Sequence, residues 1–231
     1  ALMNIDKVDD GSESFDVSVR KGKASAPLVL FAVGAGGNPE RHVTLLDTLT
    51  ESGCTVIAPH FSRLASPRPT EAELTLRARR LCLALDVFGQ SGATVSGVGH
   101  SIGAAILIAL TGGQMWLGPS QRVNISADVR LSRLALLAPP TGFFQAPNAL
   151  DAVRPPLQVW VGSADSITPP AQSELLTQTI RGWQTVDLRV IDGAGHFSFM
   201  DQSPPNTIEP LQNKQAFLRE HSSEICRFVH G

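Results

Sequence analysis

The stretch V-S-G-V-G-H-S-I-G, residues 95–103, constrains the fold of this chain more than any other. Its apolar beginning predicts a buried strand, and the apolar run 102–110 predicts a helix directly after it. Gly99 and Gly103 flank Ser101 in a G-x-S-x-G pattern. A serine on a sharp strand-to-helix turn has strained backbone angles and needs nearly side-chain-free neighbours two residues away on each side. Glycine at both positions meets that demand, so we expect Ser101 to occupy such a turn.

The bulk composition is that of a folded, nearly neutral chain. A length of 231 residues suits one α/β domain, so we expect a single domain over residues 1–231. The net charge of −2 gives no general attraction to nucleic acid or anionic membranes, and no apolar run is long enough for an integral membrane segment. The first residues lack the basic-then-apolar order of a signal peptide, although a removed one would leave no trace. We therefore expect a cytoplasmic protein.

The cysteines predict neither a disulfide framework nor a metal site. The chain has an odd number of cysteines, and they are widely spaced: Cys54, Cys82 and Cys226. Buried thiols in a reducing compartment are the simpler interpretation.

Predicted strands and helices alternate along the chain. The strands are expected at residues 15–20 (an edge strand), 27–33, 54–59, 94–99, 131–138, 157–161 and 186–191. The helices are expected after Asn38, which can cap with Pro39 at the first position, and at residues 70–88, 102–110, 169–180 and 212–229. This order predicts a doubly wound, mostly parallel sheet with helices on both faces. Such sheets carry their chemistry in loops at the carboxyl ends of the strands.

Two connecting segments affect how open the carboxyl ends of the strands are to a ligand. Residues 112–128 look irregular, with Met115 and Trp116 as apolar anchors. Residues 139–156 are too few for a separate cap domain. We therefore expect no cap domain, or a minimal lid.

His196 is the best candidate for a base that activates Ser101. A serine hydroxyl is a weak nucleophile and needs an adjacent base that a third group orients. The expected chain order is serine, acid, histidine. Among the six histidines, only His196 follows the last predicted strand in a loop of small residues. The others suit packing, structural or solvated roles, or precede the serine: His42, His60, His100, His221 and His230.

Asp165 is the preferred acid. It lies in the turn that ends the strand 157–161, before the helix expected from Pro169. A second interpretation makes Asp165 a cap for that helix. The main alternative acid is Asp192, which lies only four residues before His196 and suits a turn-stabilising role better.

Backbone donors for an oxyanion are expected at two places. The N–H of Ile102 follows the serine at the start of a helix. The loop after strand 27–33 supplies the second donor, with Ala35 the first choice and Gly36 the second. That glycine-rich loop lacks the spacing of nucleotide-binding motifs, so we expect no nucleotide to bind there.

Four segments together resemble the α/β-hydrolase superfamily. They are residues 34–38 (GAGGN), 99–103 (GHSIG), 161–165 (VGSAD) and 193–199 (GAGHFSF), and the likeness spans nearly the whole chain. Within the superfamily the chain is similar to the dienelactone-hydrolase-like group of predicted hydrolases. Two positions depart from the pattern: Ser101 stands where dienelactone hydrolase has cysteine, and Val33 where a histidine often braces the oxyanion loop.

The resemblance and the motifs predict an α/β-hydrolase fold and a serine hydrolase of carboxylic esters. Ser101, His196 and Asp165 would form the triad, with a small-molecule ester as substrate and no metal or cofactor. Thioesterase, lipase and peptidase activity stay open, as does a non-catalytic binding protein. Candidate pocket residues are Trp116, Phe143, Phe144, Phe197 and Phe199, and a loop near the expected site carries Arg63 and Arg68.

Overall fold

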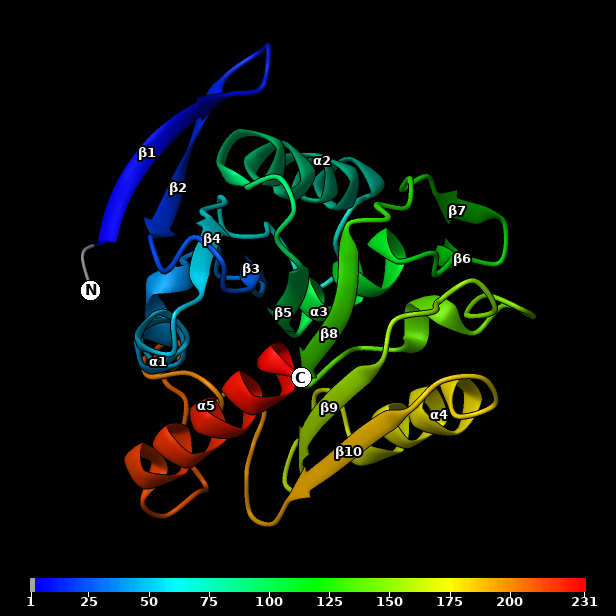
Figure 1. The fold of residues 1–231 in the computed structure, drawn as a ribbon. Coiled ribbons are helices and arrows are strands. Elements are labelled where there is room, and N and C mark those ends of the chain that lie inside the picture. The colour runs from blue at the N-terminus through cyan, green and yellow to red at the C-terminus, as the bar shows by residue number, and fades with distance from the viewer. Residues whose placement is uncertain (1–2) are drawn as a thin grey trace.

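The computed structural model describes residues 3–231 and places an eight-stranded sheet at the centre of the molecule (Figure 1). The strand order is β1-β2-β4-β3-β5-β8-β9-β10. All pairs from β4 to β10 are parallel, whereas β1–β2 and β2–β4 are antiparallel. The strand bounds are β1 Met3–Asp9, β2 Ser14–Arg20, β3 Leu28–Ala32, β4 Thr55–Pro59, β5 Val95–His100, β8 Leu131–Leu137, β9 Leu157–Gly162 and β10 Val186–Ile191.

Helices cover both faces of this sheet, as the sequence predicts. Their bounds are α1 Val43–Glu51, α2 Glu71–Phe88, α3 Ile102–Leu110, α4 Pro170–Ile180 and α5 Lys214–His230. Alternation along β3 separates two cores: Leu28 and Leu30 pack with α2, α3 and α4, whereas Val29 and Phe31 pack with α1 and α5. Strand β3 is therefore buried on both faces, which explains its unbroken apolar sequence. The molecule is a three-layer α/β sandwich.

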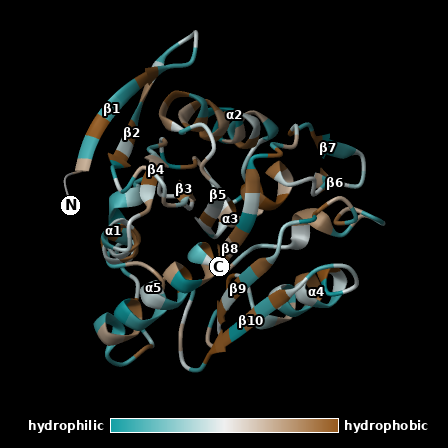
Figure 2. Cartoon of the chain, viewed as in Figure 1, coloured by the Kyte–Doolittle hydropathy of each residue, from teal (hydrophilic) through white to brown (hydrophobic). Residues whose placement is uncertain are grey.

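The edge of the sheet differs from the prediction. We expected the strand at 15–20 to lie at the edge, but β1 pairs outside β2 from Met3↔Arg20 to Asp9↔Ser14. Strand β1 alternates hydrophilic and hydrophobic residues and is exposed over most of its length (Figure 2). Its sequence M-N-I-D-K-V-D contains the charged residues typical of a protected edge strand. Because of these charges, the sequence analysis did not predict a strand there.

A second difference lies in residues 112–128, which the sequence analysis treats as irregular. They contain the hairpin β6 Met115–Gly118 and β7 Gln121–Val123, a separate two-stranded sheet. Met115 is fully buried, so it anchors this hairpin as expected. The strands are too short for a periodic signal to stand out.

The connection from β8 to β9 carries no cap domain. Within the described residues, 138–156 hold only bends, turns and the short 3₁₀ turn η2, Gly142–Phe144. The carboxyl edge of the sheet is therefore not covered by an inserted domain.

Helix starts follow the predicted signals. The side chain of Asn38 accepts a hydrogen bond from the N–H of Glu40, but the turn it caps is a 3₁₀ helix, η1 Pro39–His42, that leads into α1. Thr70 and Glu73 form the expected capping box at the start of α2. Among the helices of residues 3–231, none has the length and apolarity to cross a membrane.

Candidate active site

Ser101 lies on the sharp turn between β5 and α3, near the middle of the sheet. Its φ is 54° and its ψ −122°, a backbone conformation that a residue other than glycine rarely adopts. A Cβ at Gly103 would lie 2.1 Å from the carbonyl oxygen of Ala32, and one at Gly99 would lie 2.9 Å from Leu107 Cδ1. The two glycines therefore let α3 pack directly against the strands below it.

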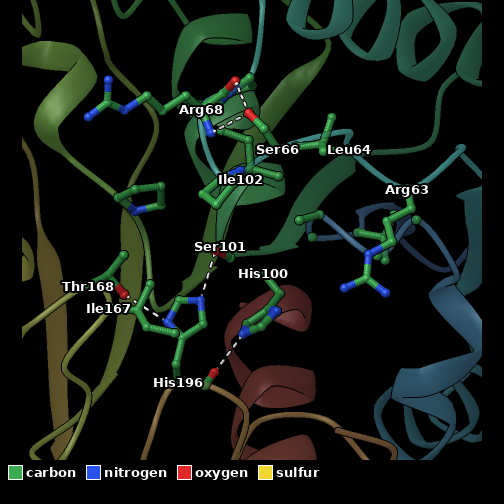
Figure 3. Close-up of a pocket in the computed structure, with 18 of the residues that line it drawn as sticks. Arg63, Leu64, Ser66, Arg68, His100, Ser101, Ile102, Ile167, Thr168 and His196 are labelled. Carbon is green, nitrogen blue, oxygen red and sulfur yellow. Dashed lines mark hydrogen bonds between the residues drawn. The ribbon is translucent and has the colours of Figure 1, made fainter. Parts of the chain in front are cut away.

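Ser101, His196 and Asp165 form a hydrogen-bonded chain. His196 Nε2 lies 2.9 Å from Ser101 Oγ, and His196 Nδ1 lies 2.8 Å from Asp165 Oδ2 (Figure 3). The loop after β9 supplies the aspartate, and the loop after β10 supplies the histidine. His196 and Asp165 are buried, whereas Ser101 is half-buried. The structure thus brings together the three residues that the sequence analysis paired.

Asp165 contacts His196, but it is not the cap of α4 that the second interpretation made it, because the N-cap of that helix is Pro169, with no side-chain hydrogen bond. Asp165 Oδ1 accepts hydrogen bonds from the N–H groups of Ile167 and Thr168, both at 2.8 Å, and so closes the turn before α4. Its Oδ2 contacts both His196 and the hydroxyl of Thr168. Burial raises the pKa of Asp165, but hydrogen bonds and charge from His196, with further hydrogen bonds from Thr168, outweigh it and hold that pKa below its ordinary value. Asp165 is therefore a carboxylate at neutral pH.

Thr168 is a site residue that the sequence analysis missed. Its hydroxyl oxygen lies 2.9 Å from Asp165 Oδ2, 3.0 Å from His196 Nδ1 and 3.1 Å from the carbonyl oxygen of Ala138. Figure 3 shows it beside the imidazole, on the side away from Ser101. The spacing Asp-x-x-Thr before a helix was the available signal, because such a threonine folds back onto the aspartate.

His100 is hydrogen-bonded to the backbone of the loop that carries His196. Its Nε2 lies 2.8 Å from the carbonyl oxygen of His196. Burial, and then the neighbouring His196 and His42, hold the pKa of His100 well below 6.5, so its ring is neutral. Because a carbonyl only accepts, Nε2 carries the proton and Nδ1 is bare. This is the structural role expected for His100.

The remaining histidines, apart from His100, lie outside this cluster of side chains. His42 and His221 are fully buried, and burial lowers their pKa values to about 4 and about 3. His60 Nε2 lies 2.6 Å from Ser18 Oγ, and His230 Nε2 lies 3.0 Å from Ser52 Oγ. The alternative acid Asp192 is exposed on the turn after β10, and the bond to His196 Nδ1 comes from Asp165 instead.

The residues of the two expected oxyanion donors line one cleft. Ala35 and Ile102 both line the space above Ser101, and so does Gly36. A Cβ built on Gly34 would lie 3.3 Å from His100 Nδ1 and 3.7 Å from Ser101 Cβ, so this loop passes directly beside the nucleophile turn. Within residues 3–231, no hydrogen bond inside the protein uses the N–H of Ala35, Gly36 or Ile102.

The cleft has a volume of about 1130 Å³. Three of the expected aromatic residues line it, Trp116, Phe143 and Phe197. The other two do not, because Phe144 and Phe199 are buried in the core. Arg63 and Arg68 line the cleft, and Figure 3 shows their guanidinium groups pointing in different directions. Across the described residues, His, Cys, Asp and Glu side chains form no group of three or more with metal-binding geometry.

Comparison with solved structures identifies the architecture as the α/β-hydrolase fold. Esterase 2 of Thermogutta terrifontis, phosphorylated by paraoxon, matches with a TM-score of 0.70 and 14% identity over 98% of this chain and 94% of that one. ATU1826 of Agrobacterium tumefaciens, a protein of unknown function described as a candidate alpha/beta hydrolase, matches with a TM-score of 0.69 and 16% identity over 98% and 96%. The Pyrococcus furiosus esterase Pf2001 matches with a TM-score of 0.68 and 14% identity over 99% and 91%. No protein-family model matches the sequence, and no curated protein matches it.

Proposed function

We propose that this protein is a serine hydrolase that cleaves carboxylic esters through an acyl-enzyme on Ser101. The observation that carries the proposal is the unbroken chain from Ser101 Oγ to His196 Nε2 at 2.9 Å and from His196 Nδ1 to Asp165 at 2.8 Å. A non-catalytic binding protein has no need of all three groups in this order. The esterase names of several structural neighbours agree with the proposal.

The reaction proceeds in two halves. Ser101 Oγ attacks the ester carbonyl while His196 Nε2 takes its proton, and the carbonyl oxygen becomes an oxyanion that the Ile102 and Ala35 N–H groups stabilise. The intermediate collapses, and His196 returns the proton to the departing alcohol. Water then attacks the acyl-enzyme by the same route and releases the acid. Asp165 holds the Nδ1–H tautomer and stabilises the imidazolium that forms twice per turnover.

The narrower assignment is to the dienelactone-hydrolase-like group, with a serine in place of the cysteine nucleophile. The oxygen nucleophile favours ordinary esters over dienelactones. Thioesters, lipids and peptides are the alternatives on the same triad, because each passes through the same oxyanion. Substrate choice therefore depends on the cleft, not on the triad.

A fluorophosphonate probe tests the nucleophile. It should form a phosphonyl ester on Ser101 of the wild type with loss of fluoride, and the Ser101→Ala variant should stay unlabelled. Ser223→Ala, at an exposed serine of α5, is the matched control and should label like wild type. A folded wild-type protein that does not react would overturn the serine hydrolase and leave the binding protein. p-Nitrophenyl esters of increasing chain length, compared with lactones and thioesters, then rank the substrate classes.

A further inference from the structure

Arg77 is a buried arginine that the triad does not explain. It lies on α2, is only 2% exposed, and forms no ion pair with any carboxylate in residues 3–231. Its guanidinium lies over the ring of Phe61 at 4.9 Å. Burial lowers the pKa of Arg77 to about 10, so the group keeps its charge at neutral pH. A buried charge is costly unless other groups solvate it.

Three backbone carbonyls solvate this charge. Arg77 donates to the oxygen of Gly34 at 2.8 Å, to that of Ala35 at 3.2 Å and to that of Ser62 at 2.9 Å. Two of the three belong to the loop expected to supply the second oxyanion donor. The N–H of Leu64 also donates to Ala35, at 2.9 Å. Arg77 therefore ties the loop after β3 to the loop after β4.

The geometry of the peptide bond connects this clamp to the cleft. In a trans peptide the C=O and the N–H point in opposite directions, and residues 3–231 contain no cis bond. When the C=O of Gly34 points at Arg77, the N–H of Ala35 in the same peptide points away from it. The C=O of Ala35 fixes the N–H of Gly36 in the same way. Both residues line the cleft beside Ser101.

We infer that Arg77 is a positioning residue for the oxyanion site: it holds the carbonyls of Gly34 and Ala35 from beneath and so directs the N–H groups above them into the cleft. The inference rests on the proposed function. It also explains how the loop is braced although Val33 stands where a bracing histidine is expected. The charge adds to the effect, because a cation on the carbonyl polarises the peptide and makes its N–H a stronger donor.

The side chain is specific for this task. The planar fork of an arginine reaches several carbonyls at fixed angles, whereas a lysine ammonium is a single point charge on a flexible stem. Arg77→Lys keeps the charge and part of the hydrogen bonding, and Arg77→Gln removes the charge. The matched control is Arg80→Gln on the same helix. Arg80 is also buried, but it pairs with Asp10 and Glu13 away from the cleft.

The test measures kcat per active site, with active sites titrated by the fluorophosphonate. Arg77→Gln should lower kcat roughly 10- to 100-fold with KM within about twofold of wild type, because an oxyanion donor acts mainly in the transition state. The kcat of Arg77→Lys should lie between those of wild type and Arg77→Gln. Binding of a trifluoromethyl ketone, whose adduct with Ser101 carries an oxyanion, should weaken by about the same factor as kcat/KM. Arg80→Gln should keep kcat per site within about twofold, even where its melting temperature falls.

The outcomes separate the two proposals. A wild-type protein that does not label overturns the proposed function and this inference with it. A labelled wild type with unchanged kcat per site in Arg77→Gln overturns the inference alone, because a purely structural arginine would reduce only the number of active sites. If Arg77→Gln fails to fold, Arg77→Lys decides by the same readout. Equal losses of kcat in the Arg77 and Arg80 variants would also overturn it.

Discussion

Thr168 contacts both His196 and Asp165, and its hydroxyl can donate only one hydrogen bond. The shorter of its two contacts with acceptors is to Asp165 Oδ2, at 2.9 Å against 3.1 Å for Ala138. Donation to Asp165 gives that carboxylate four hydrogen bonds, counting His196 and the two N–H groups on Oδ1. The aspartate is thereby fixed in the plane that the imidazole needs.

We therefore expect Thr168→Val to lower kcat about tenfold, equivalent to about 1.4 kcal/mol, and Thr168→Ser to restore most of the loss. Loss of the hydroxyl donor raises the pKa of Asp165. Asp165 then stabilises the imidazolium less well. Values of kcat for wild type, Thr168→Val and Thr168→Ser with one ester at one pH measure the loss and its rescue. Thr177→Val, at a buried threonine of α4, is the control; a Thr168→Val variant with wild-type kcat would contradict the prediction.

Gly103 makes a second prediction at the scale of one residue. A Cβ there would meet the backbone of Ala32 at 2.1 Å, and backbone cannot rotate away as a side chain can. Gly103→Ala should therefore displace α3 and lower the free energy of unfolding by about 1–3 kcal/mol. Gly118→Ala, which meets no atom within 4 Å, should be nearly neutral. Urea unfolding of both variants measures the difference, and equal stabilities would show that the turn tolerates a side chain.

At the scale of elements, α5 carries a buried neutral histidine into the core beneath the site. His221 packs against Trp160, Phe199 and Phe217, with ring centroids 4.5, 5.3 and 5.2 Å away. Neither of its ring nitrogens has a hydrogen-bond partner among the described residues. Burial, and then the nearby His42 and Arg189, lower its pKa from 6.5 to about 3. His221 is therefore neutral in the folded protein at pH values well above 3.

The sign of the pH effect follows from this lowered pKa. Below about pH 6.5 the unfolded chain binds a proton that the folded chain excludes, so stability falls as the pH falls, by up to about 1.4 kcal/mol per pH unit for one group. His221→Phe removes that group and should reduce the slope by the same amount. Urea unfolding between about pH 7 and pH 5 measures it, with His230→Gln at the exposed end of α5 as the control. An unchanged slope would mean that His221 is hydrated or already charged in the folded protein.

At the scale of the whole molecule, apolar runs predicted the parallel sheet because its strands are covered on both faces. Strand β1 and the hairpin β6–β7 were missed because polar or very short strands carry little periodic signal. The sequence paired Ser101, Asp165 and His196 because each follows a strand. Arg77 contacts Gly34, 43 residues away, and no local pattern reports that contact. The Asp-x-x-Thr spacing reports the contact of Thr168 with Asp165, but not its contact with His196, 28 residues away.

The charge around the cleft makes a prediction about substrates. Arg41, Arg63 and Arg68 line it, against a single carboxylate, Glu71. Among the described residues, Arg63 and Arg68 form no ion pair, so their charge is free to act on a ligand. Both arginines are exposed, so solvent and salt screen them and the effect is modest.

We expect an ester with a terminal carboxylate to be hydrolysed with a kcat/KM roughly two- to fivefold above that of a neutral ester of the same length, because a positive cleft raises the local concentration of anions. The advantage should shrink as salt is added, since the Debye length falls from about 10 Å at 0.1 M to about 3 Å at 1 M. The double variant Arg63→Gln, Arg68→Gln should abolish it. Arg219→Gln with Arg227→Gln on α5 removes the same charge from another face and should preserve it. If the carboxylate ester keeps its higher kcat/KM at high salt and in the Arg63→Gln, Arg68→Gln variant, the preference comes from the shape of the cleft and not from its charge.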